Sequence, residues 1–235
     1  MNMSYNFQKT VLIILLKFKI LKMGMSSAVK VSIRVRPFNR REINADAELA
    51  IQGKTNFLKI IVLYNSLFLV EGSSVTAIHH QEAKTFGYDE CFWSHSKSDA
   101  HFCDQNKVFS SVGAELISHS LDGYNCCLMA YGQTGAGKSY TMMGTKKEPG
   151  LIPQIAQNIF ERIETASRLD GVKSEVEVSY MEIYCEKVRD LLGKSDKPLR
   201  VREHPALGPY VEVSLFLFIS RVFINILLKQ LNRNW

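Results

Sequence analysis

Eight consecutive residues near the middle of the chain have the composition and spacing of a phosphate-binding loop. They match G-x-x-x-x-G-K-[ST] and are Gly132, Gln133, Thr134, Gly135, Ala136, Gly137, Lys138 and Ser139. Glycines let a backbone wrap closely around a phosphate, so that successive N–H groups point inward as donors. In this pattern the lysine reaches the β- and γ-phosphates, and the Ser139 hydroxyl binds Mg²⁺. The alternative is a chance match in a glycine-rich turn.

The phosphate-binding interpretation requires a strand before the loop and a helix after it. The run Tyr124–Tyr131 predicts a short buried strand leading into the loop, and a helix is predicted to begin at the loop's end. Upstream, helical spacing predicts a helix over Gln105–Leu121, capped by Asp104 and stopped at Asp122–Gly123. Downstream, Pro153 opens a second predicted helix, which carries an apolar stripe of Ile155, Ile159, Phe160 and Ile163 on one face. This order predicts an α/β fold, a P-loop NTPase-type mixed sheet flanked by helices.

Strands are predicted on both sides of this central region. Ala28–Pro37 alternates apolar and polar residues, as does Ser174–Tyr184, and Phe86–Trp93 has the composition of a short strand. Glu186–Leu192 is predicted as a short helical turn. Leu58–Val70 is β-prone without clear alternation, so the sequence assigns it no element.

The net charge of +6 does not indicate a nucleic-acid-binding protein, because the basic excess lies at the two ends. Residues 1–24 and 213–235 contain lysine and arginine and no acid, whereas the body between them is close to neutral. The five cysteines have no disulfide-like spacing, which indicates a reduced, intracellular protein. Val11–Leu16 is too short for a signal peptide core, and Arg221 interrupts the apolar run Val213–Leu228, which is too short for a membrane span.

The flanking motifs resemble the kinesin motor domain, and within it the kinesin-three class of cargo transporters. They are "AYGQTGAGKSYTMMG", "IRVRP", "FGYDECFW", "GLIP", "VSYMEIYCEKVRDLL" and "LRVREHPALGPYVE". They lie in the family's order across residues 28–53 and 84–212. The resemblance implies ATP and Mg²⁺ as ligands, hydrolysis coupled to movement, microtubules (tubulin) as the partner and a cytoplasmic, cytoskeletal location. It implies no nucleic acid, contact with membranes only through cargo, and a cargo or adaptor that the sequence does not identify.

The same resemblance assigns four residues to the nucleotide base. The R-x-R-P segment falls on Arg34, Arg36 and Pro37, which would lie against the adenine and ribose. The aromatic residue after the lysine–serine pair is Tyr140, which would stack on the base. The alternative is that the two arginines form only the solvated face of a strand.

Two further groups of residues are weaker candidates. Arg200, Arg202 and His204 lie in a segment that resembles part of the microtubule-binding face, although charges at an exposed strand end are often uncommitted. Two cysteines and two histidines are residue types that can bind zinc, but their spacing fits no usual zinc-finger pattern. A solvated loop is therefore the better interpretation of this segment. The four residues are Cys91, His95, His101 and Cys103.

The chain also departs from the family. Residues 1–24 are predicted to be a non-family extension, 25–212 a partial motor domain in which 54–71 departs from the pattern, and 213–235 a non-family segment. The family's switch motifs "SSRSH" and "DLAGSE" do not occur, so no catalytic residue is assigned and no turnover is expected from this chain. Two alternatives stay open, a nucleotide-binding fragment without motor activity and a membrane-associated protein anchored by its apolar ends.

Overall fold

A computed structural model describes residues 12–16, 29–47, 51–53, 73–79, 82–170, 174, 176–192, 197–205, 208–212 and 217–218. Two compact units are present, Lys22–Ser110 and a second unit that combines Met1–Leu21 with Ser111–Trp235. The unassigned segment Leu58–Val70 lies outside the described residues.

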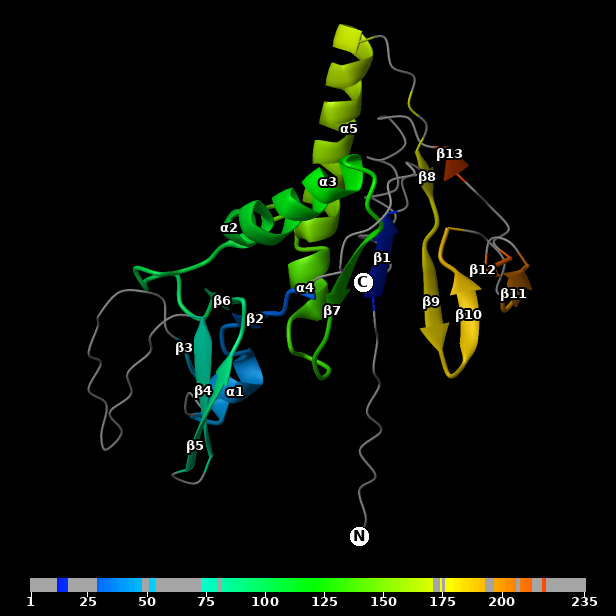
Figure 1. The fold of residues 1–235 in the computed structure, drawn as a ribbon. Helices are drawn as coiled ribbons and strands as arrows, with labels where there is room; N and C mark the ends of the chain where they lie inside the picture. The colour runs from blue at the N-terminus through cyan, green and yellow to red at the C-terminus, as the bar shows by residue number, and fades with distance from the viewer. Residues whose placement is uncertain are drawn as a thin grey trace. The chain divides into compact units, whose positions relative to one another are not determined.

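The Lys22–Ser110 unit contains two small sheets. β2 (Ser32–Val35) pairs in parallel with β6 (Glu90–Trp93), and β3 (Ile51–Gly53), β4 (Ser74–His79) and β5 (Glu82–Gly87) form an antiparallel sheet (Figure 1). The short helix α1 (Arg40–Asn44) follows β2. The strand predicted over Phe86–Trp93 is divided between β5 and β6, because the chain changes partner there. Asp89 marks the change, since its N–H donates to the Val31 carbonyl and its carboxylate accepts from the Val31 N–H.

The helix predicted over Gln105–Leu121 forms as three consecutive segments. These are α2 (Gln105–Val108), a π-helical turn (Phe109–Gly113) and α3 (Ala114–Leu121). The predicted cap is confirmed, because the Asp104 carboxylate accepts the Lys107 N–H at 2.8 Å. The predicted stop is also confirmed, since Asp122 is the C-cap and Gly123 has a positive φ of 94°.

The second unit places the glycine loop between a strand and a helix, as predicted. β7 (Cys126–Ala130) precedes the loop, α4 (Lys138–Met142) follows it, and α5 (Leu151–Asp170) continues the chain. The prediction that this strand is buried is wrong, because Cys127 and Met129 are exposed. β1 (Leu12–Leu16), from the N-terminal extension, pairs with β7 in antiparallel register.

The core of the second unit lies along α5. The apolar stripe predicted for this helix is confirmed at Ile155, Ile159 and Phe160, which are buried, whereas the fourth residue, Ile163, is half-buried. Phe160 and Met143 pack against the partly buried side chains of Val176, Val178 and Tyr180 among others. This packing attaches the strand region after α5 to the helix that begins at the glycine loop.

Short antiparallel strand pairs follow α5 in the described part of the second unit. The predicted strand over Ser174–Tyr184 forms as β8 (Glu177–Val178) and β9 (Met181–Tyr184), and β11 (Val201–His204) pairs with β12 (Gly208–Val211). Two residues of the C-terminal segment form β13 (Leu217–Phe218), which pairs with β8. None of the helices in the described part of the chain is long and apolar enough to cross a membrane.

The helical turn predicted for Glu186–Leu192 is wrong. Lys187–Asp190 is instead strand β10, which pairs antiparallel with β9 as a hairpin (Figure 1). The two connecting residues, Cys185 and Glu186, both have positive φ, at 48° and 63°. Two central residues of this kind form the tight turn that suits the twist of a hairpin, so the chain reverses instead of coiling.

Candidate nucleotide site

The loop Gly132–Ser139 has a backbone that only its glycines adopt without strain. Gly135 and Gly137 have φ values of 81° and 92°, in the left-handed region that L side chains rarely enter. Gly137 is also the N-cap residue of α4, so the loop turns directly into the helix. A loop of this shape can present successive backbone N–H groups to one anion.

Lys138 links the start of the loop to its end. Its Nζ donates to the carbonyl oxygens of Gly132 at 2.8 Å and Gln133 at 3.0 Å. The ammonium group is therefore held next to the loop backbone, where a phosphate would need a positive charge. Ser139 is exposed at the first turn of α4, directly after Lys138.

Tyr140 lies one residue further along α4 and is partly exposed, with 38% of its surface accessible. Its hydroxyl donates to Glu148 Oε2 at 2.8 Å. The sequence indicated Tyr140 but missed Glu148. Glu148 belongs to no motif, and it lies eight residues away across a chain reversal.

The reversal that carries Glu148 is a close-packed turn between α4 and α5. Gly144 and Pro149 form an isolated antiparallel bridge, and Thr145 N–H donates to the Glu148 carbonyl at 2.8 Å. The Thr145 hydroxyl accepts the Glu148 N–H at 3.1 Å. A Cβ atom at Gly144 would collide with the backbone of Glu148, Pro149 and Gly150, so glycine is required there. The turn therefore holds Glu148 in one position.

Arg34 of the R-x-R-P segment lies in the Lys22–Ser110 unit and contacts its own unit. Its Nε donates to Ser94 Oγ at 2.9 Å, and Nη1 donates to Gln105 Oε1 at 2.7 Å. Ser94 in turn donates to the Cys103 carbonyl. Arg34 thus joins β2 to the end of β6 and the start of α2, which the solvated-face alternative did not predict.

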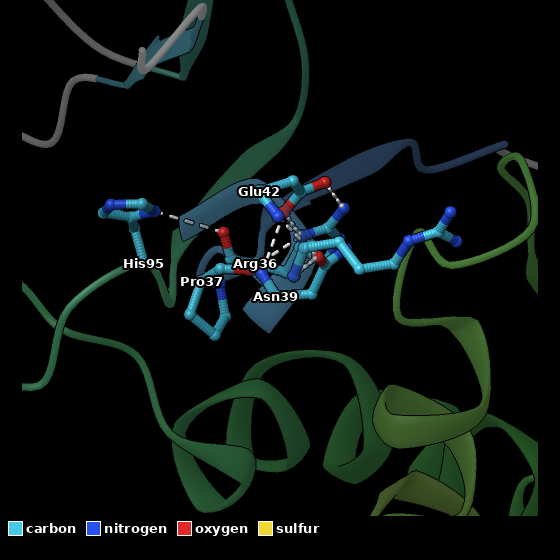
Figure 2. A network of polar contacts seen from close by, with 6 residues as sticks. Arg36, Pro37, Asn39, Glu42 and His95 are labelled. Carbon is cyan, nitrogen blue, oxygen red and sulfur yellow. Dashed lines mark hydrogen bonds and ion pairs between the residues drawn. The ribbon is translucent and has the colours of Figure 1, made fainter. Parts of the chain in front are cut away.

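Arg36 is held by the helix that follows it. Figure 2 shows its guanidinium against Glu42, with Nη1 and Nη2 donating to the two carboxylate oxygens at 2.7 and 2.6 Å. Nη1 also donates to the Pro37 carbonyl at 2.8 Å. Glu42 and Asn39 form a reciprocal capping box at the start of α1. The hydrogen bonds from Arg36, then the one from the Asn39 N–H, lower the pKa of Glu42 from 4.5 to about 2.

The structure also shows what surrounds the weaker candidates, the possible zinc ligands and Arg202. The rings of His95 and His101 lie 5.7 and 5.6 Å from the Trp93 ring, and Cys103 is buried. No three metal-binding side chains gather anywhere in the residues that the structure describes, these included. Arg202 pairs with Glu212 at 3.4 Å across the exposed β11–β12 hairpin.

A sequence model described as the kinesin motor domain matches residues 34–218. This chain belongs to the kinesin motor domain family. The motifs indicated a boundary at Glu212, and the match extends past it to residue 218. Kinesin-like protein KIF1A of Rattus norvegicus is 45% identical over 194 residues, which cover 79% of this chain and 10% of that protein. Kinesin-like protein unc-104 of Caenorhabditis elegans is 45% identical over 190 residues, covering 79% and 11%.

The resemblance to the kinesin-three class is confirmed by these relatives. This chain spans about a tenth of the length of either one.

Solved kinesin structures share the fold. One, titled "KIF14[391-772] dimer two-heads-bound state - AMP-PNP in complex with a microtubule", superposes with a TM-score of 0.73 at 34% identity. That superposition covers 89% of this chain and 55% of the other. A second, titled as the structure of a fast kinesin, gives 0.68 at 31% identity and covers 88% and 52%. The α/β fold predicted from the sequence is therefore confirmed.

Proposed function

We propose that this chain is the nucleotide-binding part of a kinesin motor domain that binds Mg²⁺ and ATP through Gly132–Ser139. The observation that carries the proposal is the loop itself, which contains two left-handed glycines and holds the Lys138 ammonium against its own backbone carbonyls. Backbone N–H groups and Lys138 would hold the β- and γ-phosphates, and Ser139 Oγ would be a ligand to Mg²⁺. The metal would neutralise charge on the phosphates.

In the whole motor domain, ATP hydrolysis would drive movement along microtubules in the cytoplasm. The titles of two solved relatives support this role, since those KIF14 fragments bind a microtubule in AMP-PNP and ADP states. Arg200, Arg202 and His204 are proposed to face acidic tubulin. The assignment of Arg34, Arg36 and Pro37 to the adenine and ribose stays a prediction from the family resemblance.

A second candidate function is nucleotide binding without turnover. The absence of "SSRSH" and "DLAGSE" from the printed sequence favours it for this chain, because groups that position water and respond to the γ-phosphate are needed for hydrolysis. Phosphate release measured with and without microtubules separates the two functions. We expect Mg·ATP binding and no stimulation, whereas robust stimulation would refute the second function.

Tyr140 is proposed to stack on the base of the nucleotide, and this role is tested by removing its ring. Tyr140→Ala should weaken Mg·ATP binding by about 1–3 kcal/mol, the usual scale for an aromatic ring stacked on a base. Inorganic tripolyphosphate has no base and should bind almost as before. Equal losses for both ligands would show that Tyr140 supports the loop and does not contact the base.

A further inference from the structure

Glu148 holds Tyr140 by a contact that the phosphate-loop pattern does not require. The Tyr140 hydroxyl donates to Glu148 Oε2 at 2.8 Å, while 38% of the tyrosine surface stays accessible. One end of the ring is fixed and part of its surface is open. This is the arrangement that a stacking platform needs.

The backbone that carries the Glu148 carboxylate is fixed by the turn between α4 and α5. Thr145 contacts the Glu148 backbone twice, through its N–H and through its hydroxyl. The Gly150 N–H donates to the Met143 carbonyl at 2.9 Å, which joins the end of the turn to the end of α4. The turn, Glu148 and Tyr140 therefore form one connected structure attached to the helix that starts at the phosphate loop.

We propose that Glu148 is a positioning residue that orients the Tyr140 ring for stacking on the base of the bound nucleotide. The inference rests on the proposed nucleotide function and adds a residue to the same site. An aromatic side chain that is already oriented loses less rotational freedom when a ligand stacks on it. The cost of immobilising one such side chain corresponds to about a two- to tenfold change in affinity.

The pair is tested by a double-mutant cycle in the full chain. Glu148→Ala and Tyr140→Phe each remove the hydrogen bond, and Tyr140→Phe retains the ring. We expect each to weaken Mg·ATP binding by about two- to tenfold. The double variant should be no weaker than either single variant, because both changes remove the same contact. Additive losses would overturn the proposal.

Three controls separate positioning from a general structural role. Glu148→Gln keeps an acceptor oxygen and should bind Mg·ATP as the wild type does, whereas a loss as large as that of Glu148→Ala would refute the hydrogen bond's role. Glu164→Ala removes a carboxylate in α5 that also has a partner, Arg168, and should not change affinity. Magnesium tripolyphosphate should bind all variants equally, and a parallel loss for this ligand would overturn the proposal.

Failure of the inference is distinguishable from failure of the proposed function. A wild-type chain that binds neither Mg·ATP nor magnesium tripolyphosphate refutes the nucleotide function and the inference with it. A chain that binds both, with Glu148→Ala unchanged for Mg·ATP, refutes the positioning role alone. Thermal unfolding of each variant verifies that the fold is retained before affinities are compared.

Discussion

Lys138→Ala should weaken Mg·ATP binding by more than any other single change in the loop. The lysine Nζ lies 2.8 and 3.0 Å from the carbonyl oxygens of Gly132 and Gln133, so its charge is held against the loop backbone. A hydrogen bond between a charged donor and a phosphate contributes about 1.5–3 kcal/mol. The expected loss is therefore about tenfold to about 150-fold in the dissociation constant.

The measurement is a titration with a fluorescent Mg·ATP analogue, repeated with magnesium tripolyphosphate. Both ligands should lose affinity, because the lysine acts on the phosphates and not on the base. Lys146→Ala is the matched control, since Lys146 is exposed on the turn between α4 and α5 and the variant makes the same change in net charge. We expect less than a twofold effect from it, as exposed charges contribute little in salt.

Two results would contradict the reasoning about Lys138. Equal affinity of Lys138→Ala and the wild type would show that the loop does not hold phosphate through this residue. Equal losses from Lys138→Ala and Lys146→Ala would show that net charge, and not the loop, determines the affinity.

Three further changes test other parts of the structure. Gly144→Ala should destabilise the chain by more than about 1 kcal/mol in thermal unfolding, because its Cβ would meet backbone atoms. Gly208→Ala is the control, since Gly208 has a similar φ of 76° and lies in open space, and this change should destabilise the chain less. Glu186→Gly should stabilise the chain by about 1 kcal/mol, because glycine adopts the positive φ at this position without strain; an unchanged unfolding temperature would contradict the hairpin geometry. Glu42→Gln should lower the unfolding temperature at pH 7. The difference between the variant and the wild type should shrink as the pH falls from 4.5 towards 2, because the folded-state pKa of Glu42 is about 2 and protonation then removes the stabilisation. A difference in unfolding temperature that does not change with pH would exclude the charged pair with Arg36.

The sequence alone determined the glycine loop, its flanking elements and the family. Gly135, Gly137 and Lys138 are recognisable from spacing because their roles depend on backbone conformation over a few residues. Asp104 was recognisable as a helix cap for the same reason, since its partner is the Lys107 N–H. The buried stripe of α5 follows from the helical repeat of Ile155, Ile159 and Phe160.

Only the tertiary structure decided the elements and contacts that depend on distant partners. Val188, Leu191 and Leu192 have helical spacing, yet Lys187–Asp190 is a strand because a reversal at Cys185 and Glu186 pairs it with β9. A window of local periodicity does not include that partner strand. The change of partner between β5 and β6 was missed for the same reason.

The side-chain partners of the predicted site residues likewise could not be predicted from the sequence. Arg36 pairs with Glu42, and Tyr140 pairs with Glu148, because a helix cap in one case and a tight turn in the other bring these carboxylates back to the chain. Spacing identifies which residue types can bind a nucleotide. The orientation of each side chain is determined by backbone reversals, whose geometry depends on packing and hydrogen bonds between residues that no local pattern connects.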